Sequence, residues 1–297
     1  MPVIPIHHVI FTRVERSYSR RNTSGYQVVY HSDALARQVA QIEKSLQCFE
    51  TGKQGSERYQ FFWTDRNQAV LARTVPLLHP DPEVIDSGRR DAFLAHALVI
   101  GQDAFAAVRN DPFAVFEAAN KANLFAEEAD QLVAYLHAEP ADKLDTPHRK
   151  RSDVAYLLDD WPADQLARLF HLGMQAPVMS RQSQSLLLLS ENQETLYDLR
   201  SLLLMLIPSP TRVSCTFDTF VDGCYPSAGS VWAMGSSKDR PHPGLLPIRL
   251  QEQRLVFKGG GDGRFPDPKV LICAASSITG SRYCAGKNNE EIGAWVA

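Results

Sequence analysis

Residues 86–100 read DSGRRDAFLAHALVI, a polar turn that runs into an apolar segment. In the apolar part, residues 93–100, polar and apolar residues do not alternate, which predicts a strand that is buried on both faces of a sheet. Its one histidine, His96, is therefore expected to be a hydrogen-bonded residue of the core. The rest of the fold is predicted outward from this strand.

The polar part of the same stretch predicts a turn. Gly88 provides the conformational freedom that a turn requires, and Asp86 is expected to pair with Arg89 across it. The consecutive residues Arg89 and Arg90 place positive charge beside the strand. We expect this turn to complete a surface that binds a partner.

The opening of the chain predicts two further strands, at residues 6–11 and 26–31, which are short apolar and aromatic runs. The segment between them, TRVERSYSRRNTSG, holds four arginines and one glutamate. It is longer than a tight hairpin turn, and loops of this size often carry function. Gly25 suits a backbone position with positive φ just before the second strand.

Helical periodicity predicts a helix over residues 33–49, with its apolar residues on one face. Ser32 or Asp33 is expected to cap its N-terminus. The other elements predicted for the first half are strands at 59–63 and 68–75, joined by a turn at 65–67, and helices at 104–108, 112–120 and 127–137.

A polar segment at residues 138–152, which contains Pro140 and Pro147, divides the chain. We place a linker there, at residues 141–152, between a first domain at 1–140 and a second at 153–297. The second half predicts helices at 162–172 and 190–207 and strands at 185–189, 212–220, 230–234, 247–250, 254–258 and 269–275. The predicted class is α+β, with a mixed, mostly antiparallel sheet and packed helices in each domain.

Composition and charge narrow the class of protein. The chain has 297 residues, of which 44% are hydrophobic and 22% charged, as in globular proteins. Its formal net charge of −3 argues against a protein that binds nucleic acid through its overall charge. Any such role requires a local basic patch.

The sequence predicts a cytoplasmic protein. Its N-terminus, MPVIP, lacks the charged region and the continuous apolar run of a signal peptide. No segment reaches the ~20 apolar residues of a membrane-spanning helix. The five cysteines are scattered and include no CxxC pair, so neither a disulfide framework nor a zinc ribbon is expected. No metal site and no cofactor are predicted.

The local basic patch is the segment between the first two predicted strands. Arginine and tyrosine are enriched where proteins bind proteins, so an acidic protein surface is one alternative partner. Aromatic side chains among basic ones also suit nucleic-acid binding, and a solvated loop without a partner is the third alternative. The predicted partner-binding residues are Arg13, Arg16, Tyr18, Arg20, Arg21, Tyr26, Arg89 and Arg90. The residues predicted to have a structural role are Gly25, Asp86, Gly88 and His96.

The sequence contains glycines, cysteines and histidines of the kinds found in active sites, but not in the spacing of a known catalytic motif. The glycine-rich segment 258–264 has its lysine before the glycines and no Ser or Thr after them, unlike a phosphate-binding loop. Cys215, with Asp218 nearby, is the best candidate nucleophile of a Cys- or His-dependent hydrolase, which is the alternative enzymatic function. Its candidate bases are His7, His8, His31, His96 and His171. No local signature supports such a pair, and no catalytic residue is assigned.

Several stretches together resemble the GTPase-associated adaptor proteins of bacterial conflict systems. FTRVERSYS and SGYQVVYHS, at residues 11–32, and FFWTDRNQAVLARTVP, at residues 61–76, are similar to the type-two N-terminal domain of that family. DSGRRDAFLAHALVI resembles its Gly-Arg pattern followed by an apolar segment with His, although Arg90 and Asp91 stand where a second glycine is common. LYDLRSLLLMLIPSPTRVSCTFDTF, at residues 196–220, resembles the middle domain of the family.

The resemblance implies a non-enzymatic adaptor. Proteins of this family are understood to be encoded beside a small GTPase and to link it to effector modules in prokaryotic immunity. The family assigns no catalytic residue and no cofactor to these domains. The expected partners are therefore a GTPase encoded nearby and effector proteins of an antiviral defence system, with no membrane association.

Overall fold

The computed structural model describes much of the first half of the chain and parts of the second. The described residues are 2–47, 57–77, 84, 92–127, 129–137, 140–149, 185–189, 197, 201, 204, 207, 209–219, 232–235, 245–251 and 254–257. The predictions that lie outside them are the turn with Asp86, Gly88, Arg89 and Arg90, the helix at 162–172, His171, the glycine-rich segment at 258–264 and the strand at 269–275.

Contacts divide the chain into two compact units. One unit comprises Met1–His148 and Thr216–Ser230, and the other comprises Arg149–Cys215 and Val231–Ala297. Helices and antiparallel strand pairs occur together, so the predicted α+β class is confirmed. The first unit therefore includes a short stretch from the second half of the sequence.

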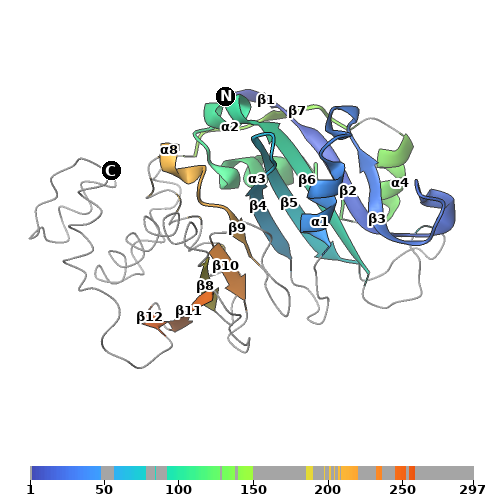
Figure 1. The fold of residues 1–297 in the computed structure, drawn as a ribbon. Coiled ribbons are helices and arrows are strands. Elements are labelled where there is room, and N and C mark those ends of the chain that lie inside the picture. Colours follow the sequence, from blue (N-terminus) through green and yellow to red (C-terminus); the bar gives the residue numbers. More distant parts are fainter. Residues whose placement is uncertain are drawn as a thin grey trace, which may run out of the picture. The chain divides into compact units, whose positions relative to one another are not determined.

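The first unit is built on an antiparallel sheet (Figure 1). Its strands in spatial order are β9 (Phe217–Asp218), β4 (Arg58–Trp63), β5 (Gln68–Pro76), β6 (Phe93–Gly101), β2 (His7–Val14) and β3 (Gly25–His31). Neighbouring strands along this order pair antiparallel. β6 lies between β5 and β2, and residues 93–100 are buried throughout, as predicted.

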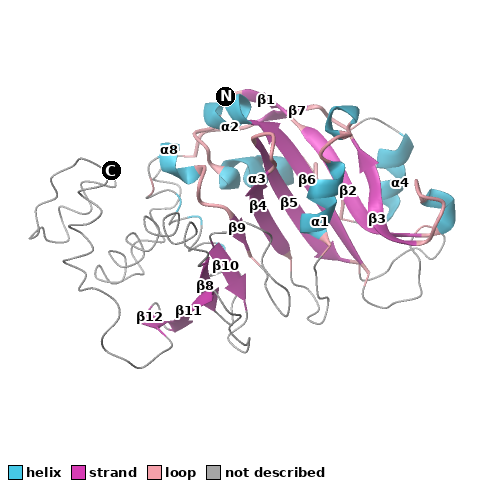
Figure 2. Ribbon diagram, in the orientation of Figure 1, coloured by secondary structure: helices cyan, strands magenta, loops and turns pink. Residues whose placement is uncertain are grey.

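Helices cover both faces of this sheet (Figure 2). They are the short 3₁₀ turns η1 (Arg16–Tyr18) and η2 (Asp33–Leu35) and the helices α1 (Val39–Leu46), α2 (Gln102–Ala107), α3 (Pro112–Lys121) and α4 (Ala129–His137). α1 packs over β2 and β3, and its residue Ile42 joins Phe11, Val28 and Phe93 in one apolar cluster. No helix within the described ranges is long and apolar enough to cross a membrane.

The opposite face of the sheet carries α2, α3 and α4. The Phe61 ring of β4 lies 5.3 Å from Phe105 of α2 and 6.0 Å from Phe217 of β9, between ring centroids. Phe113 of α3 stacks on the same Phe217 ring at 5.2 Å. Leu132 of α4 belongs to a second apolar cluster on this face, which we call the α4 cluster. Its buried members are Ile10, Val14, Val29, Val75, Leu77, Val84, Ala92, Leu94, Ala126 and Leu132.

A side-chain cap explains where α3 begins, whereas the cap predicted at Ser32 or Asp33 does not form. α3 starts directly after Asp111, whose Oδ1 accepts the backbone N–H groups of the next turn at 3.0 and 3.3 Å. The prediction of a continuous helix from Asp33 is wrong, because only η2 forms there and α1 begins at Val39. The Ser32 hydroxyl accepts the N–H of His8 at 2.9 Å, so it serves the sheet and does not cap the helix.

A two-stranded antiparallel sheet in the first unit joins β1 (Val3–Pro5) to β7 (Lys143–Asp145). The backbone N–H of Ile6 donates to the carbonyl of Asp142 at 2.9 Å and extends this pairing. The sequence predicts a linker at residues 141–152, and β7 corrects the first part of that prediction. Only Leu144 of this strand is buried, which is too little apolar sequence to indicate a strand.

The second unit has a mixed sheet. Its described strands are β8 (Ser185–Leu189), β10 (Trp232–Gly235), β11 (Leu245–Gln251) and β12 (Arg254–Phe257). β8 pairs in parallel with both β10 and β11, and β11 pairs antiparallel with β12. The prediction of a mostly antiparallel sheet is therefore wrong for these strands. Parallel neighbours require a crossover connection, and Tyr197, Ser201 and Leu204, between β8 and β10, are helical.

The predicted strand at residues 212–220 is wrong over most of its length. Ser209–Arg212 forms a short helix, α8, in the second unit, and Phe217–Asp218 is the strand β9 of the first unit. Pro210 favours the helix because its ring sets φ near the value of a first helical turn. The alternation of apolar residues after Arg212 is therefore not that of one long strand.

Candidate functional site

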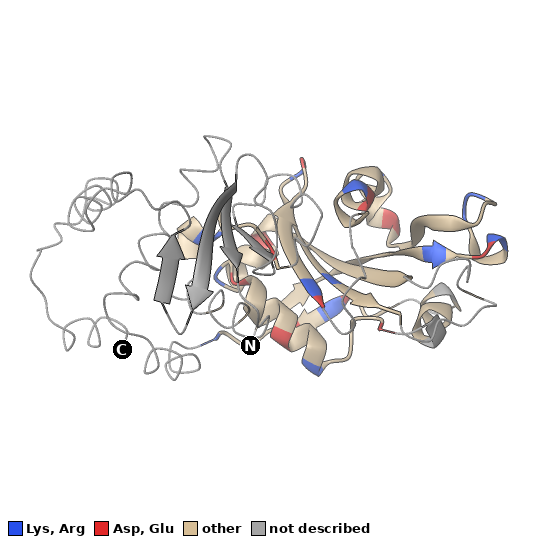
Figure 3. Ribbon diagram, turned by 90° about the horizontal axis from the view of Figure 1, so that it is seen from below, with Lys and Arg blue, Asp and Glu red and all other residues tan. Residues whose placement is uncertain are grey.

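The predicted basic segment forms the loop that joins β2 to β3. These strands stay paired as far as Val14 and Gly25, so the loop comprises residues 15–24, and we call it the Arg loop. Arg13 and Tyr26 lie opposite each other on the paired strands at its base. Figure 3 shows basic ribbon segments (blue) gathered on this loop and on the adjoining strand.

Side-chain hydrogen bonds hold the Arg loop in a defined conformation. Ser19 Oγ accepts the backbone N–H groups of Arg21 and Thr23, both at 3.1 Å. The same hydroxyl donates to Gln27 Oε1 at 2.9 Å, and the Gln27 amide donates to the carbonyl of Thr23 at 2.9 Å. Gln27 belongs to β3 and is only 2% exposed. A buried strand residue therefore anchors an exposed loop.

Two backbone positions at the loop require positive φ. Asn22 has φ of +55°, and Gly25 has φ of +128°. The value at Gly25 is one that residues with a Cβ rarely adopt, which confirms the positive φ predicted there. A Cβ at Gly25 would meet no atom within 4 Å, so backbone conformation and not space requires glycine.

The three arginines of the Arg loop are exposed, but their surroundings differ. Arg21 Nη2 lies 2.6 Å from Glu43 Oε2 on α1, and the two side chains are 59% and 7% exposed. Arg16 Nε donates to Asn22 Oδ1 within the loop at 2.9 Å. Arg20 makes no ion pair with any residue in the described ranges. Arg20 is thus the most available charge, and Arg21 also ties the loop to α1.

The aromatic residues predicted for this surface attach it to the sheet. Tyr26 stacks on Phe93 and Phe11, with ring centroids 4.7 and 5.8 Å apart. The Arg13 guanidinium lies over the Tyr26 ring, 5.9 Å from its centroid. Tyr18 is half-buried against the α4 cluster. The tyrosine rings therefore anchor the loop, and the arginines are its exposed groups.

His96 belongs to a separate polar site inside the first unit, where His8 is its partner. Nδ1 of His8, on β2, lies 2.9 Å from Nε2 of His96, on β6. His96 Nδ1 is 2.8 Å from the backbone N of Ala126, and His8 Nε2 is 2.8 Å from the carbonyl oxygen of Ala141. All four ring nitrogens have partners and both residues are buried, which confirms the prediction of a hydrogen-bonded core histidine.

The backbone partners determine which ring nitrogens carry protons. The Ala126 N–H can only donate, so His96 Nδ1 accepts and carries no proton. His96 Nε2–H then donates to His8 Nδ1, and His8 Nε2–H donates to the Ala141 carbonyl. Burial lowers the pKa of His8, an effect that the Ala141 carbonyl partly offsets and His7 increases. Burial, and then the neighbouring His8, lower the pKa of His96.

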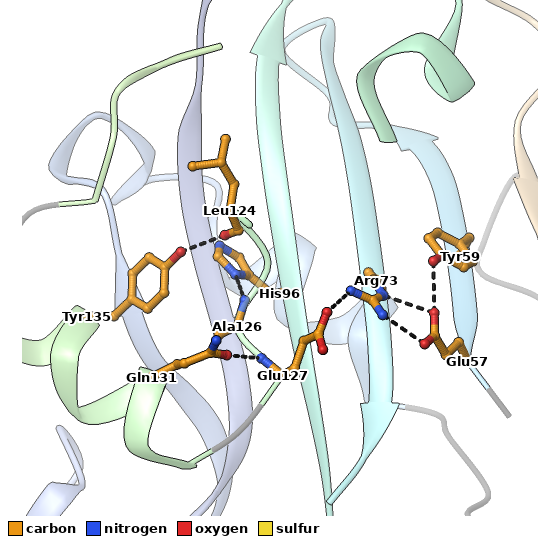
Figure 4. A network of polar contacts seen from close by, with 9 residues as sticks. All are labelled: Glu57, Tyr59, Arg73, His96, Leu124, Ala126, Glu127, Gln131 and Tyr135. Atoms are coloured by element: carbon orange, nitrogen blue, oxygen red, sulfur yellow. Dashed lines mark hydrogen bonds and ion pairs between the residues drawn. The ribbon is translucent and has the colours of Figure 1, made fainter. Parts of the chain in front are cut away.

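The connection between α3 and α4 is held against the sheet beside His96 (Figure 4). The Tyr135 hydroxyl, on α4, donates to the carbonyl of Leu124 at 2.5 Å. The backbone N–H of Glu127 donates to Gln131 Oε1 at 2.6 Å. Together with the bond from Ala126 to the imidazole, these contacts link residues 124–127 to α4 on one side and to β6 on the other.

Arg73, on β5, connects the same segment to a second polar group (Figure 4). It pairs with Glu127 and with Glu57, whose Oε1 lies 2.7 Å from Arg73 Nη2. The Tyr59 hydroxyl donates to Glu57 Oε2 at 2.8 Å. Burial raises the pKa of Glu57, but the bonds from Arg73 and Tyr59 outweigh it and the net shift is downward. Burial also raises the pKa of Tyr59 to about 12, so its hydroxyl keeps the proton that it donates.

The residues considered for hydrolysis are engaged in other contacts. Asp218 accepts a bidentate pair from Arg58, with Nε–Oδ1 and Nη2–Oδ2 distances of 2.7 and 2.5 Å. The buried Cys215 donates from Sγ to the carbonyl of Thr211 at 3.6 Å. The ring nitrogens of the paired histidines are all bonded. Within the described residues, no three or more His, Cys, Asp or Glu side chains form a group that could hold a metal ion.

Sequence reasoning identified the loop arginines and His96 but missed the residues that position them. Gln27 and Glu43 are polar residues flanked by Val28 and Ile42, and a polar residue inside an apolar pattern is a usable signal of a buried hydrogen bond. His8 meets His96 diagonally across the β2–β6 register. That register is a long-range property that no local motif contains.

No protein-family model matches the chain. A search of curated proteins likewise finds none with a matching sequence. The resemblance to GTPase-associated adaptors therefore stays a prediction from the residues quoted above.

Proposed function

We propose that this chain is a non-catalytic, two-domain adaptor that binds a small GTPase through the Arg loop and couples it to effector proteins. The N-terminal domain carries the Arg loop, and a middle domain follows in the second half of the chain. The setting is the cytoplasm of a bacterium, in a conflict system that acts against viruses. The choice of a GTPase as the partner rests on the resemblance, and the choice of surface rests on the geometry of the loop.

The observation that carries the proposal is a preorganised loop that presents arginines. Ser19 and the buried Gln27 fix the backbone of the Arg loop before any partner arrives. Preorganisation reduces the conformational entropy lost on binding. The exposed guanidinium groups are suited to bidentate contacts with carboxylates. This combination favours an acidic patch on a folded protein.

The same contacts favour a protein partner over single-stranded nucleic acid. Binding of single strands relies on exposed aromatic rings on which bases stack. Tyr26 uses its ring against Phe93 and Phe11, and Tyr18 packs against the α4 cluster. The loop therefore offers positive charge without an aromatic platform.

The test is a binding measurement with the GTPase encoded beside this gene, loaded with GDP or with a non-hydrolysable GTP analogue. Wild-type protein is expected to form a complex with one of these forms. Replacing Arg16, Arg20 and Arg21 together by glutamine should weaken the complex at least about tenfold, since arginines are frequent hot spots of interfaces. Raising the salt concentration should also weaken it, because exposed charges are screened.

A matched control removes the same charge elsewhere. Arg37, Arg66 and Lys121 are exposed and lie outside the Arg loop, so their joint replacement by glutamine should leave the affinity within about twofold of wild type. Circular dichroism should show both triple variants folded. The proposal fails if the wild-type chain binds neither form of the GTPase, or if the two triple variants bind equally well.

A further inference from the structure

The His8–His96 pair joins two segments outside the sheet to two adjacent strands of the first unit. The imidazole of His96 accepts the backbone N–H of Ala126, in the connection between α3 and α4. His8 donates its Nε2–H to the carbonyl of Ala141, shortly before β7. The rings themselves belong to adjacent strands of the sheet. The pair therefore fastens the α3–α4 connection and the approach to β7 onto β6 and β2.

The pair has no position for an additional proton. His96 Nδ1 is occupied by the Ala126 N–H at 2.8 Å, and His8 Nδ1 is occupied by the His96 Nε2–H at 2.9 Å. A proton on either nitrogen would place two donors face to face. Protonation therefore requires that one of these hydrogen bonds break. The bond to Ala126 is the one that belongs to a connection outside the sheet.

No carboxylate in the described part of the chain bonds to a ring nitrogen of the pair, where it would compensate an added positive charge. Tyr135 of α4 lies closest, with its ring centroid 5.1 Å from that of His96 and 6.1 Å from that of His8. Arg73 lies across the β5–β6 ladder from His96, and its guanidinium pairs with carboxylates on other segments. The remaining titratable neighbours are Tyr30 on β3, His7 on β2, Glu127 beside Ala126 and Asp142 beside Ala141. The ring nitrogens themselves contact only N–H, imidazole and carbonyl groups.

Breaking the hydrogen bond between Ala126 and His96 would also loosen α4. Tyr135 and Gln131 bind the α4 helix to residues 124–127 by hydrogen bonds at 2.5 and 2.6 Å. Once the bond to His96 breaks, the described contacts that still hold the segment and α4 include the ion pair with β5, from Glu127 to Arg73, and the apolar packing of Ala126 and Leu132 in the α4 cluster. The Glu127 side chain of that ion pair is 52% exposed. Exposed ion pairs contribute little to stability. The segment and the helix are therefore positioned to open together as a local unit.

We infer that His8 and His96 form an acid-released latch: protonation of the pair frees residues 124–127 and α4 from the sheet, while the strand ladder of β5, β6 and β2 stays formed. The inference concerns the first unit alone and does not depend on the proposed binding of a GTPase. The opening of residues 124–127 and α4 would therefore depend on pH.

The test is hydrogen exchange on the full chain at pH 7.5 and pH 5.5, with rates corrected for the intrinsic dependence of exchange on pH. The opening constant of residues 124–137 should rise below the ordinary histidine pKa, by at most about tenfold per pH unit for each proton taken up. Amides of the β5–β6 ladder should keep their protection. Equal protection of residues 124–137 at the two pH values would overturn the inference.

Variants distinguish opening caused by protonation of His8 and His96 from other effects of acid on the protein. His8→Asn/His96→Asn removes both titrating groups, and asparagine at position 96 keeps an acceptor near the Ala126 N–H, so the pH dependence of opening should disappear. His137→Gln, at the exposed end of α4, is the matched control and should behave as wild type. If the double variant does not fold, imidazole ¹⁵N spectra of the wild type still decide. Both rings should be Nε2–H tautomers at pH 7.5, and a ring that titrates without movement of the Ala126 amide signal contradicts the latch.

Discussion

Arg58 and Asp218 are 160 residues apart in the sequence and form a bidentate ion pair inside the first unit. Their side chains are 1% and 0% exposed. Gln60 adds a longer hydrogen bond to the same carboxylate at 3.4 Å. The short strand β9 is therefore held to β4 by charge as well as by its backbone pairing and by the ring of Phe217.

Breaking this ion pair should destabilise the first unit strongly. Asp218→Asn leaves the Arg58 guanidinium buried without its counter-charge, and we expect a loss of about 3–5 kcal/mol in the free energy of unfolding. Urea denaturation followed by tryptophan fluorescence measures it. Arg21→Gln, at the half-exposed pair with Glu43, is the control and should cost at most about 1 kcal/mol. Similar losses in the two variants would mean that burial of the Arg58 pair has no special effect.

The sequence predicts those parts of the first unit that depend on local patterns. Three features follow from local sequence: the burial of β6 from an apolar run that only His96 interrupts, and the start of α3 from Asp111 before Pro112. The third is the turn between β4 and β5, predicted at residues 65–67, where Asn67 has φ of +55°. The predicted strand at residues 212–220 contains β9, but its short extent and its place beside β4 could not be predicted, because they depend on pairing with Gln60 and Phe61. The same holds for β1 and β7, whose pairing joins the start of the chain to residues 143–145.

In the candidate site, too, some features follow from the local sequence and others depend on how the sheet pairs. The arginines of the Arg loop stand out because their charge is concentrated in a short segment. The roles of Tyr18 and Tyr26 as anchors depend on which side of the sheet each ring packs against, and the bulge between Ile10 and Phe11 shifts the β2–β3 register. A one-residue shift moves side chains to the opposite face, so composition alone does not separate anchors from contact residues.

Acid should destabilise the chain through the paired histidines. The pKa values of His8 and His96 are lowered in the folded state, so below pH 6.5 the unfolded chain binds protons that the folded chain does not. The stabilising contribution of the neutral pair is fully present above that pH and is lost as the pH falls. Between pH 7.5 and 5.5 we expect a loss of at most roughly 3 kcal/mol relative to a His8→Asn/His96→Asn variant. Urea midpoints at the two pH values measure the difference, and parallel pH profiles would contradict it.

Gly25→Ala should destabilise the hairpin through backbone conformation alone. Gly25 has φ of +128°, and a Cβ there would meet no atom within 4 Å, so the expected cost of about 1–3 kcal/mol is conformational. Gly101→Ala is the matched control, because Gly101 also has open space around it but has an ordinary φ of −63°. We expect its effect on thermal unfolding to stay within about 0.5 kcal/mol. Equal effects of the two substitutions would show that the Gly25 conformation is not maintained in solution.

Gln27→Leu should disorder the Arg loop and leave the sheet intact. The substitution removes the bonds from Gln27 to Ser19 and Thr23, while leucine is still compatible with a buried strand position. A polar group left without its partner costs about 1–3 kcal/mol, a cost that the loop avoids by opening to water. Limited digestion with trypsin measures this opening, since the loop contains the cleavable residues Arg20 and Arg21.

Cleavage within the Arg loop should become several-fold faster in Gln27→Leu, because an opened loop exposes its backbone to the protease. Gln41→Leu is the control, since the Gln41 side chain bonds to Asp65, in the turn between β4 and β5, and makes no hydrogen bond with the described residues of the Arg loop. Its digestion at Arg20 and Arg21 should match the wild type. If Gln27→Leu resists trypsin as the wild type does, the loop conformation is set by its backbone and by the Arg21–Glu43 pair. In that case the preorganisation on which the binding surface rests does not come from Gln27.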